Sequence, residues 1–262
     1  MITDYYILIS LFIICIYFCY YIFSNLNNNN QLPIPEWFNN EKIPKTIYIT
    51  SKNKLPDYVI NNWKKLNQDY EVIFYNDDKI KEFLKESYPV EYLNYFNKLD
   101  SIKGAGPIKA DFWRLCILYK YGGIYVDSDI EPFASINNFL EEDTDFLTCG
   151  SNIIRDPNPH IIVSKPNDRI LKKCLDIYET YFNKEYGYWK HSITKVMKKA
   201  LKYYFKKYNN HLEKNYHLND YKIQIIMEKY HIFNHSKDYC TYKNRRVLNN
   251  RYQNYDPVNN TF

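Results

Sequence analysis

Several features that identify common protein classes are absent from this chain of 262 residues. No two cysteines have the C-x-x-C spacing of a zinc or redox site. The 35 basic and 30 acidic residues give a net charge of +5, spread along the chain without the clustered basic face that nucleic-acid binding needs. There is no internal repeat, and no Ser-His-Asp or Cys-His arrangement marks a covalent nucleophile. These absences remove nucleic acid from the expected partners and covalent catalysis from the expected mechanisms.

The composition is that of a folded protein. Hydrophobic residues make up 45% of the chain and aromatic residues 18%, enough for one sizeable core. The six cysteines are best explained as small buried apolar residues. In an oxidising compartment, a Cys149–Cys174 or a Cys174–Cys240 disulfide remains a possible alternative.

The N-terminal segment has the character of a membrane anchor. Residues 5–23 contain no charged side chain, and tyrosines crowd both ends of the run. As a helix they would span about 28 Å, close to the hydrocarbon thickness of a bilayer. A cleaved signal peptide would need a basic start, but the flank formed by residues 1–4 carries Asp4, and no Lys or Arg precedes Lys42. We therefore expect an uncleaved transmembrane helix.

The remaining chain divides by composition. Residues 24–42 are polar, with an asparagine run and two prolines, and predict a stalk. Residues 43–235 alternate strand-like and helix-like segments, which favours an α/β domain with a mostly parallel sheet flanked by helices. Residues 236–262 predict a polar C-terminal tail. The expected strands are 46–50, 70–75, 124–126, 146–148, 161–164 and 222–227, and the expected helices are 57–66, 77–86, 90–99, 107–121, 168–182 and 190–208.

The most informative stretch lies in the middle of the domain. Pro107 suits the first turn of a helix, and Gly122-Gly123 ends it before a short apolar strand. Asp127 and Asp129 follow that strand, at the kind of edge where open α/β sheets bind their ligands. Two neighbouring acids repel each other unless a cation joins them. A divalent ion such as Mn²⁺ or Mg²⁺, with a nucleotide diphosphate, would suit this pair.

Two charged residues precede the acids on the expected helix. Asp111 and Arg114 are three residues apart and therefore share one helix face. Arg114 could bind a carboxylate, a diphosphate or a sugar, and Asp111 could accept hydrogen bonds from sugar hydroxyls. The simpler alternative is an ion pair between the two on a solvated helix.

The ordered series D-x-x-R, helix, Y-G-G-I-Y and D-x-D resembles the DXD-containing glycosyltransferases. These include relatives of the yeast initiating α-1,6-mannosyltransferase and the inositol-phosphoceramide mannosyltransferases, and large clostridial glucosylating toxins have a similar core. The stretch Ile43-Pro44-Lys45-Thr46-Ile47-Tyr48 is similar to the family's opening strand. Tyr48 stands where the family usually has histidine, and the family's late motifs are not visible.

The resemblance implies a GT-A fold, a Rossmann-like sheet with a metal site. It assigns Asp127 and Asp129 to the metal and the nucleotide ribose, and Asp111 and Arg114 to the donor sugar. It makes Asp127, Asp129 and Arg114 the catalytic group. Tyr48 and Thr50 would lie beside the nucleotide base.

The expected function is therefore metal-dependent transfer of a hexose, with retention of anomeric configuration. The donor would be GDP-mannose or a UDP-sugar, and the acceptor a glycan or a lipid. Two alternatives remain: a membrane-anchored sugar-nucleotide or glycan binder that has lost catalysis, and a glycoside hydrolase, whose two acids normally lie about 5 Å or more apart. A transferase of this kind would be a type II membrane protein facing the Golgi or endoplasmic-reticulum lumen, although the positive-inside rule would keep the lysine-rich side in the cytosol.

Overall fold

The computed structural model describes residues 42–151, 156–205, 215–218, 220–230 and 238–256. The predicted anchor (5–23) and all but the last residue of the predicted stalk (24–42) lie outside these ranges. Within them, no helix is both long enough and apolar enough to cross a bilayer.

The described strands form a single ten-stranded sheet. Its order is β2-β1-β3-β6-β5-β8-β9-β10-β4, and β7 pairs with β8 away from this path. The strands are β1 (Thr46–Thr50), β2 (Glu71–Tyr75), β3 (Gly123–Asp127), β4 (Glu131–Pro132), β5 (Phe146–Ser151), β6 (Pro157–Ser164), β7 (Tyr216–Leu218), β8 (Tyr221–Lys229), β9 (Tyr239–Tyr242) and β10 (Arg245–Asn249).

The sheet is mixed, so the prediction of a mostly parallel sheet was wrong. Among the described strands, β1 is parallel to β2 and β3, and β5 is parallel to β8. The other pairings are antiparallel. The reason is that several consecutive strands are joined without an intervening helix, and such short connections can only produce antiparallel neighbours. Alternation of helices and strands holds only as far as β3.

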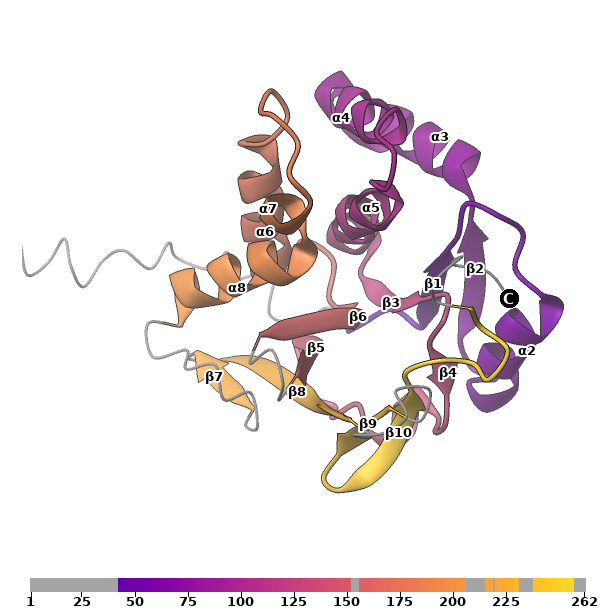
Figure 1. The fold of residues 1–262 in the computed structure, drawn as a ribbon. Helices are drawn as coiled ribbons and strands as arrows, with labels where there is room; N and C mark the ends of the chain where they lie inside the picture. Colours follow the sequence, from indigo (N-terminus) through magenta and orange to yellow (C-terminus); the bar gives the residue numbers. More distant parts are fainter. Residues whose placement is uncertain (1–41, 152–155, 206–214, 219, 231–237, 257–262) are drawn as a thin grey trace, which may run out of the picture. The chain divides into compact units, whose positions relative to one another are not determined.

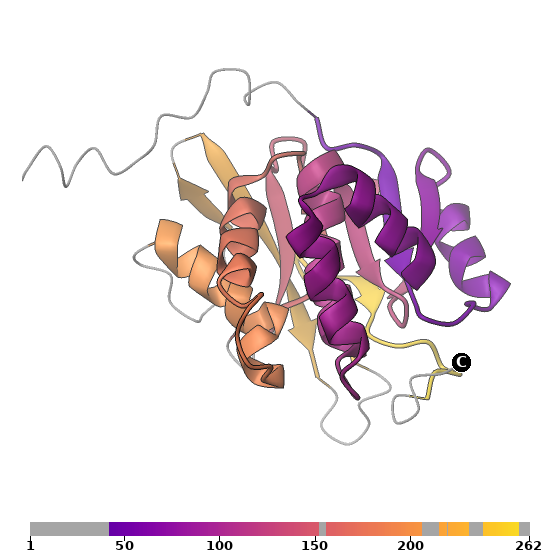
Figure 2. The same cartoon turned by 90° about the horizontal axis from the view of Figure 1, so that it is seen from above.

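Most of the helices cover one face of the sheet (Figures 1 and 2). There, Tyr48, Tyr125 and Phe146 from the strands pack with α5 residues such as Phe112 and Trp113. On the opposite face, alternate strand residues such as Ile49 and Val126 pack with Trp63 of α2. The helices are α2 (Asp57–Leu66), α3 (Asp77–Ser87), α4 (Val90–Asp100), α5 (Gly106–Tyr121), the short 3₁₀ turn η2 (Ile136–Asn138), α6 (Arg169–Glu179), α7 (Tyr188–His191) and α8 (Ile193–Tyr204).

Local chemistry explains where several helices begin and end. Pro107 lies in the first turn of α5, and Gly122 ends that helix with φ of 65°. Asp168 caps α6 by accepting hydrogen bonds from the amides of Ile170 and Leu171. The side chain of Asn76 caps α3 by accepting a hydrogen bond from Lys79 N.

The C-terminal region differs from the predicted polar tail. Residues 239–242 and 245–249 form β9 and β10, which extend the sheet beyond β8. Charged and polar residues dominate this segment, but Cys240, Val247 and Leu248 are buried in the core. Because few apolar residues anchor these strands, their alternation was too weak to recognise in the sequence.

The cysteine pairings considered from the sequence do not occur. All four described cysteines are free and buried. Cys174 belongs to the core under the helices, whereas Cys149 and Cys240 belong to the core on the other face of the sheet. The sheet therefore separates Cys174 from both of its proposed partners.

Candidate active site

The two predicted acids lie where the parallel strands β1 and β3 end. Thr50, the last residue of β1, is in register with Asp127, the last residue of β3. A turn follows, in which Ile130 N donates to Asp127 O over 3.1 Å. Asp127 and Asp129 are half-buried. The carboxylates thus lie at the carboxyl edge of the sheet, as the sequence predicted.

Arg114 is the centre of a buried ion-pair network that reaches this edge. Its Nη2 atom lies 2.9 Å from Asp111 Oδ1 and 2.8 Å from Asp127 Oδ1. Its Nη1 atom donates to the carbonyl oxygen of Pro159 over 2.6 Å, and its guanidinium carbon lies 4.3 Å from the ring centre of Tyr125. The planar guanidinium therefore joins helix α5 to the ends of β3 and β6.

Exposure increases along this network towards Asp127. The side chains of Arg114 and Asp111 are 5% and 10% exposed, and that of Asp127 is 29% exposed. The Tyr125 hydroxyl also donates to Asp127 Oδ1, over 2.8 Å. The pair predicted on α5 is thus not an ion pair on a solvated helix, because Arg114 is buried and is shared with the D-x-D motif.

Asp111 is held from both sides. Its Oδ2 atom accepts the backbone N–H of Ile193, the first residue of α8, over 2.9 Å. Burial raises the pKa of Asp111 to about 6, although Arg114 and this hydrogen bond oppose the rise. Asp111 therefore links α5 to α8.

The surroundings of Asp129 disfavour its ionised form. Burial and the negative charge of Asp127 raise its pKa to about 7, against the opposing charges of His160 and Arg251. Tyr252 N donates to the Asp129 carbonyl over 3.1 Å, which places residues 251–255 beside the motif. The pKa of Tyr255 rises to about 12, first through burial and then through the charges of Asp129 and Asp127.

This donor set fits a hard divalent cation. The Asp127 carboxylate contacts Tyr125 and Arg114 through Oδ1, which leaves Oδ2 to a ligand. A second carboxylate lies two residues away, and its ionised form is disfavoured until a positive charge approaches. Carboxylate oxygens are the ligands that Mg²⁺ and Mn²⁺ prefer. In the described ranges, no third His, Cys, Asp or Glu joins Asp127 and Asp129 in a three-ligand group.

The residues predicted beside the nucleotide base are near the edge but mostly covered. Thr50 is buried, and its hydroxyl donates to the carbonyl of Tyr75 over 2.9 Å. Tyr48 packs with Tyr75 in the core under the helices, and burial raises its pKa to about 12. In the pairing of β1 with β3, Thr50 lies beside Asp127, and Tyr48, two residues earlier, lies beside Tyr125. Their roles towards a base stay predictions.

Three contributors to this site were not predicted from the sequence. They are the Pro159 carbonyl, His160 and residues 251–255. His160 precedes Ile161, which pairs with Val126 directly before Asp127. Burial lowers the pKa of His160, but the nearby negative charges of Cys240, Glu228 and Asp127 outweigh burial and raise it. These residues lie outside any local motif, so only the contacts in the folded structure reveal them.

Residues 54–146 match the family of the glycosyltransferase sugar-binding region containing the DXD motif. Inositol phosphoceramide mannosyltransferase 3 of Schizosaccharomyces pombe is 37% identical over 92 residues, which are 34% of this chain and 24% of that protein. The mannosyl phosphorylinositol ceramide synthase CSH1 of Saccharomyces cerevisiae is 32% identical over 132 residues, or 44% of this chain and 34% of that protein. The chain thus spans about a quarter to a third of these relatives.

The solved structure of the PaToxG glycosyltransferase has a similar fold. It superposes with a TM-score of 0.51 at 19% identity, covering 63% of this chain and 70% of that one. At this identity the likeness concerns the fold alone. It supports the predicted α/β, GT-A-like architecture, and the family match confirms the resemblance inferred from the D-x-x-R and D-x-D series.

Proposed function

Because residues 54–146 carry the sugar-binding region of the DXD-containing glycosyltransferases, we propose that this protein transfers a hexose from a nucleotide sugar. The donor is GDP-mannose or a UDP-sugar, and the acceptor is a glycan or a lipid. The observation that carries the proposal is the Asp111–Arg114–Asp127 network, which fixes the first carboxylate of the D-x-D pair at the carboxyl edge of β3. The mannosyltransferase names of the relatives favour mannose.

In this proposal each residue of the network has a separate task. Asp127 and Asp129 hold a divalent ion, which when bound neutralises charge on the leaving nucleoside diphosphate. Arg114 orients Asp127 through Nη2, since both of its carboxylate contacts are already made within the protein. Tyr125 supports the same carboxylate oxygen. Asp111 anchors Arg114 and connects it to α8 through Ile193 N.

We further propose that transfer retains the anomeric configuration of the donor. The leaving phosphate would then take the proton of the acceptor hydroxyl on the same face of the sugar, so that no covalent enzyme nucleophile is needed. This agrees with the residues at the edge, where both acids are suited to holding a cation. Analysis of the product anomer by nuclear magnetic resonance checks this point, and an inverted product would exclude it.

Turnover of nucleotide sugars tests the proposal. With Mn²⁺, the full chain should hydrolyse or transfer from one of the candidate donors. Chelation, or the Asp129→Ala substitution, should reduce the rate by at least about 100-fold, the usual scale for losing an electrostatic contact to a transition state. Asp78→Ala is the matched control, because Asp78 is an exposed acid on α3.

Two results would contradict the transferase. Donor binding without turnover of any nucleotide sugar would favour a binder that has lost catalysis. Activity that survives both chelation and Asp129→Ala would show that the D-x-D pair does not hold an essential metal.

We also propose that residues 5–23 anchor the protein in a membrane as a type II protein with residues 43–262 in the lumen. The support is the uncharged, tyrosine-flanked sequence of this segment. Protease digestion of sealed microsomes tests this, and a fully digested C-terminal domain would exclude the lumenal orientation.

A further inference from the structure

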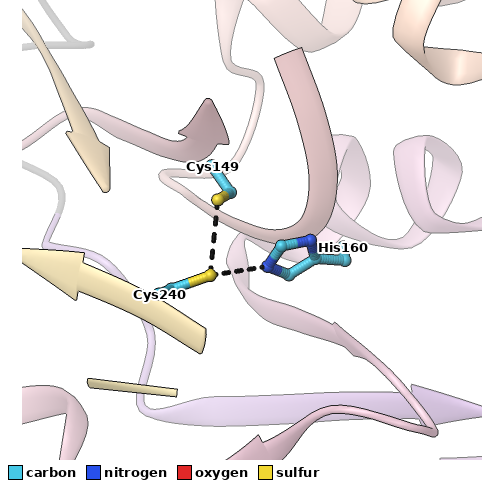
Figure 3. A group of neighbouring side chains, drawn as sticks. All are labelled: Cys149, His160 and Cys240. Carbon is cyan, nitrogen blue, oxygen red and sulfur yellow. Dashed lines mark hydrogen bonds between the residues drawn. The ribbon is translucent and has the colours of Figure 1, made fainter. Parts of the chain in front are cut away.

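Two cysteines and a histidine from three strands meet in the core behind the D-x-D edge. Cys149 comes from β5, His160 from β6 and Cys240 from β9. Figure 3 shows the three side chains converging, with the Cys240 sulfur between the other two. Cys149 and Cys240 are 0% exposed and His160 is 6% exposed. Such a buried group of potential ligands is not explained by the proposed transfer reaction.

We propose that Cys149, His160 and Cys240 bind a zinc ion. The Cys149 and Cys240 sulfurs are 3.5 Å apart, and His160 Nε2 lies 3.2 Å from the Cys240 sulfur. All three potential ligand atoms lie within 4.8 Å of one another. In tetrahedral zinc sites, bond lengths of about 2.3 Å to sulfur and about 2.0–2.1 Å to nitrogen place two sulfurs about 3.8 Å apart and sulfur and nitrogen about 3.6 Å apart. The two distances to the Cys240 sulfur reach these values with movements of a few tenths of an ångström, and the distance between Cys149 and His160 lies within 4.8 Å.

A buried carboxylate beside the cluster supports a cation there. Asn250 Oδ1 lies 3.2 Å from the Cys240 sulfur, and the amide of the same side chain hydrogen-bonds Glu228. Glu228 is 4% exposed and also accepts from Asn158 Nδ2 over 3.1 Å. Among the described residues, no lysine or arginine forms an ion pair with Glu228. A buried charge of this kind is costly unless a positive charge compensates it. Without metal, His160 offers that charge, since Glu228 helps to raise its pKa. A zinc ion bound to neutral His160 would supply the positive charge instead.

Asn250 also offers a fourth ligand. Its Oδ1 atom faces the Cys240 sulfur, while its Nδ2 atom donates to the Glu228 carboxylate. Zinc with three protein ligands keeps a fourth position for water or another oxygen donor, and structural sites close this position. With Asn250 the site would be closed, which suits a role in joining β5, β6 and β9.

The strand order favours a metal over a disulfide between Cys149 and Cys240. Strand β8 lies between β5 and β9, so the two cysteines are not on neighbouring strands. A disulfide needs its Cα atoms about 4.4–6.8 Å apart. Neighbouring strands lie about 4.8 Å apart, so strands with one strand between them lie about twice as far apart. The sulfurs of a disulfide must also approach to about 2.05 Å, whereas zinc holds them close to the observed 3.5 Å.

The proposed zinc site is distinct from the D-x-D pair in its chemistry. Thiolate and imidazole select zinc and similar softer ions, whereas the carboxylates of Asp127 and Asp129 suit Mg²⁺ or Mn²⁺. The two sites are neighbours in the sheet, because His160 precedes the residue that pairs with Val126. Zinc would therefore stabilise the antiparallel strands that support the edge without taking part in transfer.

Metal content and cobalt spectroscopy of the full chain test the proposal. The protein, purified in detergent without metal-affinity chromatography, should contain one equivalent of zinc by mass spectrometry. After exchange with Co²⁺ it should show a near-ultraviolet thiolate-to-cobalt charge-transfer band. Cys240→Ser and Cys149→Ser should each lose this band, whereas Cys174→Ser, a buried cysteine in the other core, should keep it.

Asp129→Asn separates this proposal from the proposed function, since it should abolish transfer and leave the cobalt band unchanged. If a ligand variant does not fold, the wild-type measurement still decides. The proposal is overturned if the wild-type chain takes up neither zinc nor cobalt with a thiolate band. A band that survives both cysteine substitutions would also overturn it, as would a Cys149–Cys240 cross-link found in the unreduced protein.

Discussion

At the scale of single residues, Arg114 does the most to define the site. The spacing D-x-x-R was enough to predict that Asp111 and Arg114 share a helix face, and the structure places them 2.9 Å apart. It was not enough to show that the same Nη2 atom also reaches Asp127, since that contact depends on how α5 packs on β3. The Pro159 carbonyl was equally invisible, because a backbone acceptor leaves no trace in residue identity.

Arg114→Ala should therefore cost stability as well as activity. It leaves the buried Asp111 carboxylate and the Pro159 carbonyl without their cationic partner. Removing one member of a buried pair typically lowers the free energy of unfolding by about 3–5 kcal/mol. Lys81→Ala, which removes a half-exposed ion pair with Asp100, should cost less than about 1 kcal/mol. Urea denaturation of both variants checks this, and equal losses would show that the Arg114 network does not stabilise the fold.

At the scale of elements, the junction between α5 and β3 sets the position of the D-x-D motif at the end of β3. Gly122 and Gly123 have φ values of 65° and 102°, a region that other residues rarely adopt. A Cβ atom on Gly123 would lie 2.8 Å from the Thr46 carbonyl oxygen in the neighbouring strand β1. The double glycine was recognisable as a helix stop in the sequence, but its close approach to β1 was not.

Gly123→Ala should destabilise the protein by at least about 2 kcal/mol, through backbone strain and overlap with β1. Gly106→Ala is the matched control, because a Cβ atom there would meet nothing within 4 Å. Its effect should stay within about 0.5 kcal/mol. Thermal or chemical unfolding of the two variants measures the difference, and a neutral Gly123→Ala would contradict the described junction.

The cap of α6 gives a prediction about pH. Burial raises the pKa of Asp168 from 3.8 to about 6, against the opposing hydrogen bonds from Tyr221 and two backbone amides. The folded state binds the proton of the Asp168 carboxyl more tightly than the unfolded state does. The stability that this proton binding contributes is therefore present below pH 3.8 and is lost as pH rises through about 6. Relative to Asp168→Asn, which does not titrate, the wild-type chain should lose up to about 3 kcal/mol between pH 4 and pH 7. Paired urea titrations at several pH values check this, and a pH-independent difference would exclude the raised pKa.

At the scale of the whole molecule, the sequence described the first half of the domain better than the second. From β1 to β3, helices alternate with strands, and their apolar periodicity predicted every element close to its observed bounds. After β3 most strand pairings are antiparallel, α-helices among the described residues separate only β6 from β7, and β9 and β10 carry few apolar residues. Residues 251–255 of this region pack beside Asp129 through contacts far apart in the sequence.

The central claim is that Asp127 and Asp129 together bind a divalent ion with a nucleotide diphosphate. Electron paramagnetic resonance titration of Mn²⁺ into the full chain, with GDP or UDP present, measures this directly. The wild-type chain should show one nucleotide-dependent Mn²⁺ site, and Asp143→Asn should keep it, since Asp143 is an exposed acid paired with Lys222. Asp129→Asn should abolish this site. Equal Mn²⁺ binding by the wild-type chain and Asp129→Asn would contradict the account.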